Sequence, residues 1–125
     1  MFRIKVDQEK NRIYLKLGTI KTGDGEQIFK QLQAELHLFA HGFAGVSDIS
    51  TFKVNDPKEG VWVEKIFTLL AKAGMGISAR VTGVKGKNKK AIGRHGYPVA
   101  VVETLAKANR FLDLLQKKHL KMLKY

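Results

Sequence analysis

A glycine-rich basic segment over residues 83–96 contains the side chains best suited to binding chemistry. It holds four glycines and no acidic residue, and its cations are Lys85, Lys87, Lys89, Lys90 and Arg94. Glycines allow close backbone approach to a ligand, and these cations suit phosphate or carboxylate groups. The segment lacks the Gly-x4-Gly-Lys-Ser/Thr of a P-loop, and only Tyr97 stands nearby for base stacking. We expect a loop with one helical turn at Lys89–Ile92 that binds an anion or a partner; a purely solvated loop is the alternative.

A second group of polar side chains begins near the end of a short, half-apolar stretch over residues 43–50. It consists of Asp48, Ser50, Thr51, Asp56 and Lys58. We expect the two carboxylates to order this loop and the hydroxyls and Lys58 to contact a partner. Two nearby carboxylates can also perform acid–base chemistry, but helix capping already accounts for Asp56. The sequence therefore favours a binding protein over an enzyme.

Metal and cofactor chemistry have little support in the sequence. His37 and His41 share a helical spacing, but no third ligand accompanies them. The absence of cysteine excludes thiolate sites and disulfides and fits a reducing cytoplasm. We expect neither a metal nor a cofactor.

The net charge of +12 is concentrated in the second half of the chain. Residues 1–62 hold 9 cations and 8 anions, whereas residues 63–125 hold 14 cations and 3 anions. This asymmetry favours an anionic partner. An acidic protein, nucleic acid and an anionic lipid surface all fit it, and so does a protein whose charge serves only solubility. A homo-oligomer is also left open.

Apolar periodicity predicts the elements that position these groups. Alternation over residues 2–6 and 13–17 indicates an opening hairpin, and helices and further strands alternate after it. The predicted order is β-β-α-β-α-β-loop-β-α. We therefore expect one α/β domain over residues 1–125, with helices packed on a mixed, mostly parallel sheet of about five strands.

Local signals predict where the three helices begin. Asp24 is expected to cap the first helix in a capping box with Gln27. Asp56 precedes Pro57, with Glu59 three residues after the cap, which is a strong start for the second helix. Thr104 is expected to cap the last one.

Four segments resemble the STAS superfamily, the fold of anti-sigma-factor antagonists, and especially its sporulation-antagonist-like branch. Residues 45–50 are similar to a family strand that ends in Asp-Leu-Ser, and the helix opening at Asp56 stands eight residues beyond Asp48. Residues 73–78 are similar to the family's helix exit, and residues 101–108 to its closing strand and helix. The order of elements matches over almost the whole chain.

The resemblance implies a non-enzymatic regulatory module that binds a protein or an anionic ligand. Regulatory antagonists of this family carry Ser-Ser/Thr-Gly after the Asp, and the second hydroxyl is phosphorylated. Here Pro57, Lys58 and Glu59 follow Asp56. The resemblance therefore implies partner binding without that phosphorylation switch.

Overall fold

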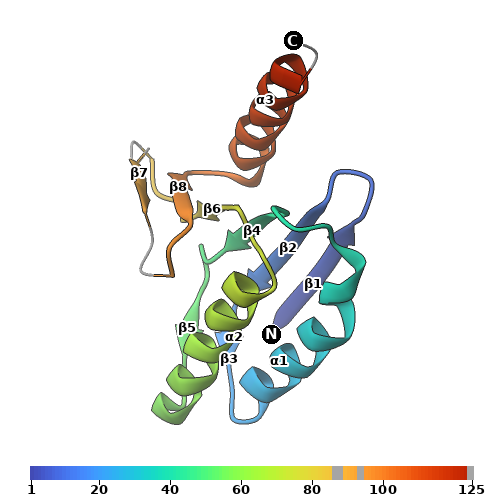
Figure 1. Cartoon of the computed structure of the whole chain (residues 1–125). Coiled ribbons are helices and arrows are strands. Elements are labelled where there is room, and N and C mark those ends of the chain that lie inside the picture. The colour runs from blue at the N-terminus through green and yellow to red at the C-terminus, as the bar shows by residue number, and fades with distance from the viewer. Residues whose placement is uncertain (86–88, 93–94, 124–125) are drawn as a thin grey trace.

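The computed structural model describes residues 1–85, 89–92 and 95–123 of the chain (Figure 1). Strands and helices alternate along most of its length. In chain order the elements are β1 (Phe2–Asp7), β2 (Arg12–Leu17), β3 (Thr19–Ile20), α1 (Asp24–Glu35), the 3-10 helix η1 (Leu36–Leu38), β4 (Ala44–Asp48), β5 (Lys53–Val54), the 3-10 helix η2 (Pro57–Glu59), α2 (Gly60–Lys72), β6 (Ile77–Val81), β7 (Lys89–Ile92), β8 (Pro98–Val102) and α3 (Leu105–Leu123).

The main sheet is mixed and has six strands in the order β1-β2-β4-β6-β8-β7. Strands β2, β4, β6 and β8 run parallel to one another, while β1 and β7 pair antiparallel with β2 and β8 at the two edges. The predicted α/β class and the opening hairpin are confirmed. The small parallel pair β3 and β5 forms a separate two-stranded sheet.

The interpretation of residues 83–96 as a loop with a helical turn was wrong at Lys89–Ile92. These residues form β7, whose register places Lys89 opposite Val101 and Ile92 opposite Pro98. Strand β8 offers a free edge, and pairing with that edge satisfies backbone groups that the local sequence leaves undecided. This strand raises the sheet from the expected five or so to six.

The two faces of the sheet are covered unequally (Figure 1). Helices α1 and α2 bury one face, where Ile13 and Leu15 of β2 meet Leu32 and Ile66. Helix α3 covers the other face, where Leu112 packs with Val46 and Ala79 of the central strands. No helix other than α3 packs on that face among the described elements, and α3 lies mainly over β4, β6 and β8. Much of the hairpin is therefore uncovered on the α3 side.

The first helix begins differently from the expectation. Its N-cap is Gly23, with φ of 91°, and Asp24 instead accepts a hydrogen bond from the backbone N–H of Lys21 at 2.9 Å. Glu59 of η2 accepts from the N–H groups of Gly23 and Gly25 at 3.1 and 2.9 Å. A buried carboxylate from a distant segment thus caps α1, where the helix dipole favours negative charge.

The capping roles of Asp56 and Thr104 are confirmed, but Asp56 caps the 3-10 helix η2, and α2 itself begins at Gly60 with Glu59 as its N-cap. Asp56 accepts from the N–H of Lys58 at 3.0 Å, although the first turn after it is 3-10. Thr104 accepts from the N–H of Lys107 at 3.2 Å and so caps α3. Both caps are local, as the sequence pattern requires.

The contact between α1 and α2 leads to a test of the fold. A Cβ added at Gly25 would lie 2.3 Å from the Cβ of Trp62. We expect Gly25→Ala to lower the free energy of unfolding by about 1–3 kcal/mol in urea titrations, because the two helices must separate. Gly60→Ala is the matched control, since a Cβ there meets nothing within 4 Å. Equal stability of the two variants would contradict this arrangement.

Candidate functional site

Asp48 orders the loop after β4, as the sequence predicted. Its Oδ1 accepts hydrogen bonds from the backbone N–H and the hydroxyl of Ser50, at 3.1 and 2.7 Å. Ser50 and Thr51 are exposed. The loop therefore presents hydroxyl groups to solvent at the carboxyl end of β4.

Asp56 is hydrogen bonded to a different part of the chain, and Lys58 is hydrogen bonded to Asp56. Asp56 Oδ2 accepts from the hydroxyl of Thr22, just before α1, at 2.8 Å. This bond and the Lys58 N–H lower the pKa of the Asp56 carboxyl. Lys58 itself is exposed. These two residues belong to the junction between the starts of α1 and α2.

The basic segment begins beside the loop that Asp48 orders. A Cβ at Gly83 would lie 3.1 Å from the Cβ of Ser50, so the residues after β6 run next to that loop. Lys85 follows directly and is exposed. Lys89 and Lys90 belong to β7, whereas Lys87 and Arg94 lie outside the described residues. The segments after β4 and β6 therefore lie side by side at the carboxyl ends of these two parallel strands.

The far end of the basic segment is tied to α2. The Nε2 of His95 lies 2.9 Å from Oε1 of Glu64. The His95 ring is also stacked with that of Tyr97, at 6.3 Å between centroids. Burial raises the pKa of the Tyr97 hydroxyl. These contacts hold the chain as it enters β8.

The structure also contains a groove that the sequence analysis did not predict, although the predicted site residue Asp48 lies in its lining. We name it the open-face groove, because it lies on the part of the sheet that α3 leaves uncovered. Its volume is about 310 Å³. It is lined by Arg3, Lys5, Tyr14, Leu15, Lys16, Val46, Asp48, Leu105 and Asn109.

Strand register brings three cations together at this groove. Arg3 of β1 stands directly opposite Lys16 of β2, and Lys5 stands opposite Tyr14. The Lys5 Nζ lies 6.0 Å from the centre of the Tyr14 ring, a weak cation–π contact. Like charges opposite each other on paired strands are destabilising. An anion bound between Arg3 and Lys16 would relieve this repulsion.

The three cations have no charged partner within the described part of the chain. None of them forms an ion pair there, although Lys16 is also the register partner of Asp48. Asp48 is the one carboxylate in the groove lining, and its Oδ1 is engaged by Ser50. The groove therefore has an excess of positive charge.

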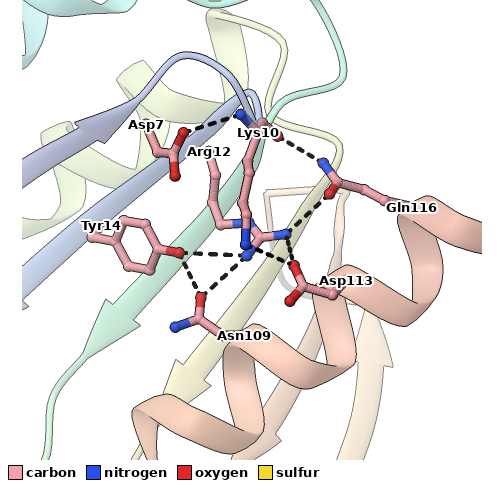
Figure 2. Close-up of polar contacts among 7 residues, drawn as sticks. All are labelled: Asp7, Lys10, Arg12, Tyr14, Asn109, Asp113 and Gln116. Atoms are coloured by element: carbon pink, nitrogen blue, oxygen red, sulfur yellow. Dashed lines mark hydrogen bonds and ion pairs between the residues drawn. The ribbon is translucent and has the colours of Figure 1, made fainter.

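One wall of the groove is the first part of α3, which a partly buried polar cluster around Arg12 holds against the hairpin. This Arg12 cluster consists of Arg12, Tyr14, Asn109, Asp113 and Gln116 (Figure 2). The Arg12 side chain is fully buried and reaches from β2 toward α3. Asn109 belongs both to the cluster and to the groove lining.

All four terminal N–H bonds of Arg12 are directed at oxygen acceptors. Its Nη1 donates to Asn109 and to the Tyr14 hydroxyl, at 3.1 and 3.4 Å. Its Nη2 donates to Asp113 and Gln116, at 3.0 and 3.3 Å. The Arg12 hydrogen bond is the main cause that lowers the pKa of the Asp113 carboxyl, and Lys10 adds to it from 3.3 Å.

The sequence contained a signal for the groove that was not used. The alternation in Phe2–Asp7 and Arg12–Leu17 places apolar side chains on one face and Arg3, Lys5, Arg12 and Lys16 on the other. The small net charge of residues 1–62 directed attention to the second half instead. Counting the charged residues on each face of the predicted strands would have indicated the groove.

Comparisons with protein-family models, with curated proteins and with solved structures find no match for this chain. Among residues 1–85, 89–92 and 95–123, no helix has the length and hydrophobicity needed to span a bilayer. The same residues contain no group of three or more His, Cys, Asp or Glu side chains placed to hold a metal ion.

The Arg12 cluster predicts how stability depends on pH. We expect Asp113→Asn to lower the free energy of unfolding by about 1–3 kcal/mol at neutral pH, because Arg12 loses its charged partner. A lowered folded-state pKa means that the carboxylate stabilises the fold above the unfolded-state pKa and stops doing so as pH falls through the folded-state value. The difference between the two proteins should therefore shrink below about pH 4.

Urea titrations across acidic and neutral pH measure this difference. Glu26→Gln is the control, because it removes the exposed Glu26–Lys30 pair of α1. Such a surface pair contributes about 0–1 kcal/mol. An Asp113→Asn effect no larger than this control, or one that does not change with pH, would contradict the assigned role.

Proposed function

We propose that this chain is a non-enzymatic binding module that receives an anionic group of its partner in the open-face groove. The observation that carries the proposal is the set of three cations around the groove that form no ion pair within the described residues, with Arg3 and Lys16 opposed across the hairpin. Their mutual repulsion is reduced when an anion lies between them. Binding energy is thus available at this surface before any shape complementarity is considered.

The groove lining is richer in cationic binding groups than in the commonest catalytic ones. It contains no histidine, serine or threonine, and the Oδ1 atom of its one carboxylate accepts two hydrogen bonds from Ser50. General acid–base or nucleophilic catalysis needs a nucleophile or base free to reach substrate. A binding role fits these residues better than an enzymatic one.

A protein partner fits the groove better than nucleic acid does. Apolar atoms of Val46 and Leu105 lie among the cations, which suits a segment carrying both acidic and apolar side chains. The one aromatic ring in the lining, Tyr14, is held by its hydroxyl in the Arg12 cluster. Single-stranded nucleic acids usually require several rings for base stacking. The resemblance to regulatory antagonists also supports a protein partner.

Charge reversal in the groove tests the proposal. We expect polyglutamate to bind the wild-type protein and to lose about tenfold in affinity with Lys16→Glu, because a favourable charge becomes repulsive. Lys72→Glu is the matched control, because it makes the same change of charge at an exposed position. Lys72 belongs to α2, which packs on the other face of the sheet. Fluorescence anisotropy of labelled polyglutamate measures both affinities.

Two further probes separate the alternatives in the same assay. A DNA duplex and vesicles of anionic phospholipid replace polyglutamate, at low and at physiological salt. Equal losses of polyglutamate affinity with Lys16→Glu and Lys72→Glu would show that only net charge matters. That result would overturn the groove as the binding site. Binding of DNA or vesicles alone, lost with Lys16→Glu, would overturn the protein partner in favour of nucleic acid or membrane.

A further inference from the structure

The lining of the groove reaches β1, the strand at which the main sheet ends. Strand β1 pairs with β2 alone and is the outermost strand. The N–H of Gly18 donates to the carbonyl of Met1, so Met1 directs its backbone groups at the strand that pairs with β1. Backbone groups of alternate residues then face β2, and those of Phe2, Ile4 and Val6 face outward.

These outward groups have no backbone partner among the described residues. An edge of this kind is a template for another strand. A strand added there would continue the sheet beyond β1 and so extend the floor of the open-face groove, of which Arg3 and Lys5 of β1 are lining residues. The edge and the groove therefore constitute one docking surface.

The side chains of β1 define what such a strand must carry. Arg3 and Lys5 are exposed on the groove face, whereas Phe2 and Ile4 pack on the other face against the core under α1. Neighbouring strands place side chains on the same face about 5 Å apart. The added strand therefore needs acidic residues at alternate positions beside Arg3 and Lys5, and apolar residues between them.

The same charges disfavour full-length pairing with a second copy of this chain. If two β1 edges paired antiparallel in the register centred on Ile4, Arg3 of each copy would stand opposite Lys5 of the other. Like charges opposite each other are destabilising, and natural sheets use such charges to prevent edge-to-edge association. Arg3 and Lys5 would instead attract a strand that carries acidic side chains.

We infer that the partner's docking segment is an extended stretch of alternating acidic and apolar residues that adds to the free edge of β1. This inference rests on the proposed function of the groove. The backbone of the segment bonds with the outward groups of β1, its acidic side chains meet Arg3 and Lys5, and its apolar side chains extend the face of Phe2 and Ile4. Affinity comes from the backbone ladder and selectivity from the charges.

Two peptides of equal composition test the inference. One, of about eight residues, alternates Glu and Val, and the other has its Glu and Val residues in two blocks. Only the alternating peptide can place every carboxylate on the groove face. We expect it to bind at least about tenfold more tightly than the block peptide, as measured by fluorescence anisotropy.

Amide hydrogen exchange locates the bound peptide. We expect the amides of Ile4 and Val6 to gain protection on addition of the alternating peptide, while the amide of Lys5, already directed at β2, changes little. Methylation of the peptide's backbone nitrogens should abolish the gain, because the ladder then lacks donors. Binding without protection of Ile4 and Val6 would overturn strand addition.

A charge exchange provides the control for folding. The double variant Arg3→Glu, Lys5→Glu should no longer bind the alternating Glu–Val peptide and should bind a peptide of alternating Lys and Val. A misfolded protein would bind neither peptide. Lys72→Glu should keep the original preference. Equal affinity for the alternating and block peptides would overturn strand addition and leave the groove as an anion site. Failure of every acidic probe to bind would overturn the proposed function as well.

Discussion

The buried guanidinium of Arg12 is the constraint on which the arrangement of the α3 side depends. A cation taken out of water is costly unless acceptors surround it, and here β2 and α3 jointly supply them. Helix α3 can satisfy Arg12 only by lying where Asn109, Asp113 and Gln116 reach the same side chain. That position covers the central strands and leaves the outer hairpin open. The groove exists because the helix is held there.

Positive charge is therefore used in two different ways on one sheet face. Arg12 is enclosed, paired and structural, whereas Arg3, Lys5 and Lys16 are left without ion-pair partners within the described chain. Unrelieved repulsion at a surface is the kind of local conflict that natural proteins tolerate at functional positions. Arg12 has an ion-pair partner in Asp113, although its Nε lacks a hydrogen-bond partner among the described residues. The contrast between this paired cation and the three without ion pairs supports a binding role for the groove.

Local signals predicted those features whose causes are local. Asp56 and Thr104 bond to backbone groups two or three residues away, and the hairpin follows from alternation and a polar turn, so each could be inferred from its own segment. Glu59 could not, because its carboxylate caps a helix that begins 35 residues earlier in the chain. Strand β7 was missed because pairing with β8, and not its own composition, defines it. The groove was missed because its cations were counted by chain half and not by strand face.

The sequence by itself determined the element order, the α/β class, the alternation of the hairpin and two of the three predicted helix caps, because periodicity and caps act over a few residues. It also determined the excess of positive charge. Only the tertiary structure decided which charges meet. Strand register set Arg3 against Lys16, the docking of α3 enclosed Arg12, and Glu59 joined the starts of α1 and α2. These outcomes depend on contacts between distant segments, and the energy of a charge depends on its neighbours and its burial, which no local pattern contains.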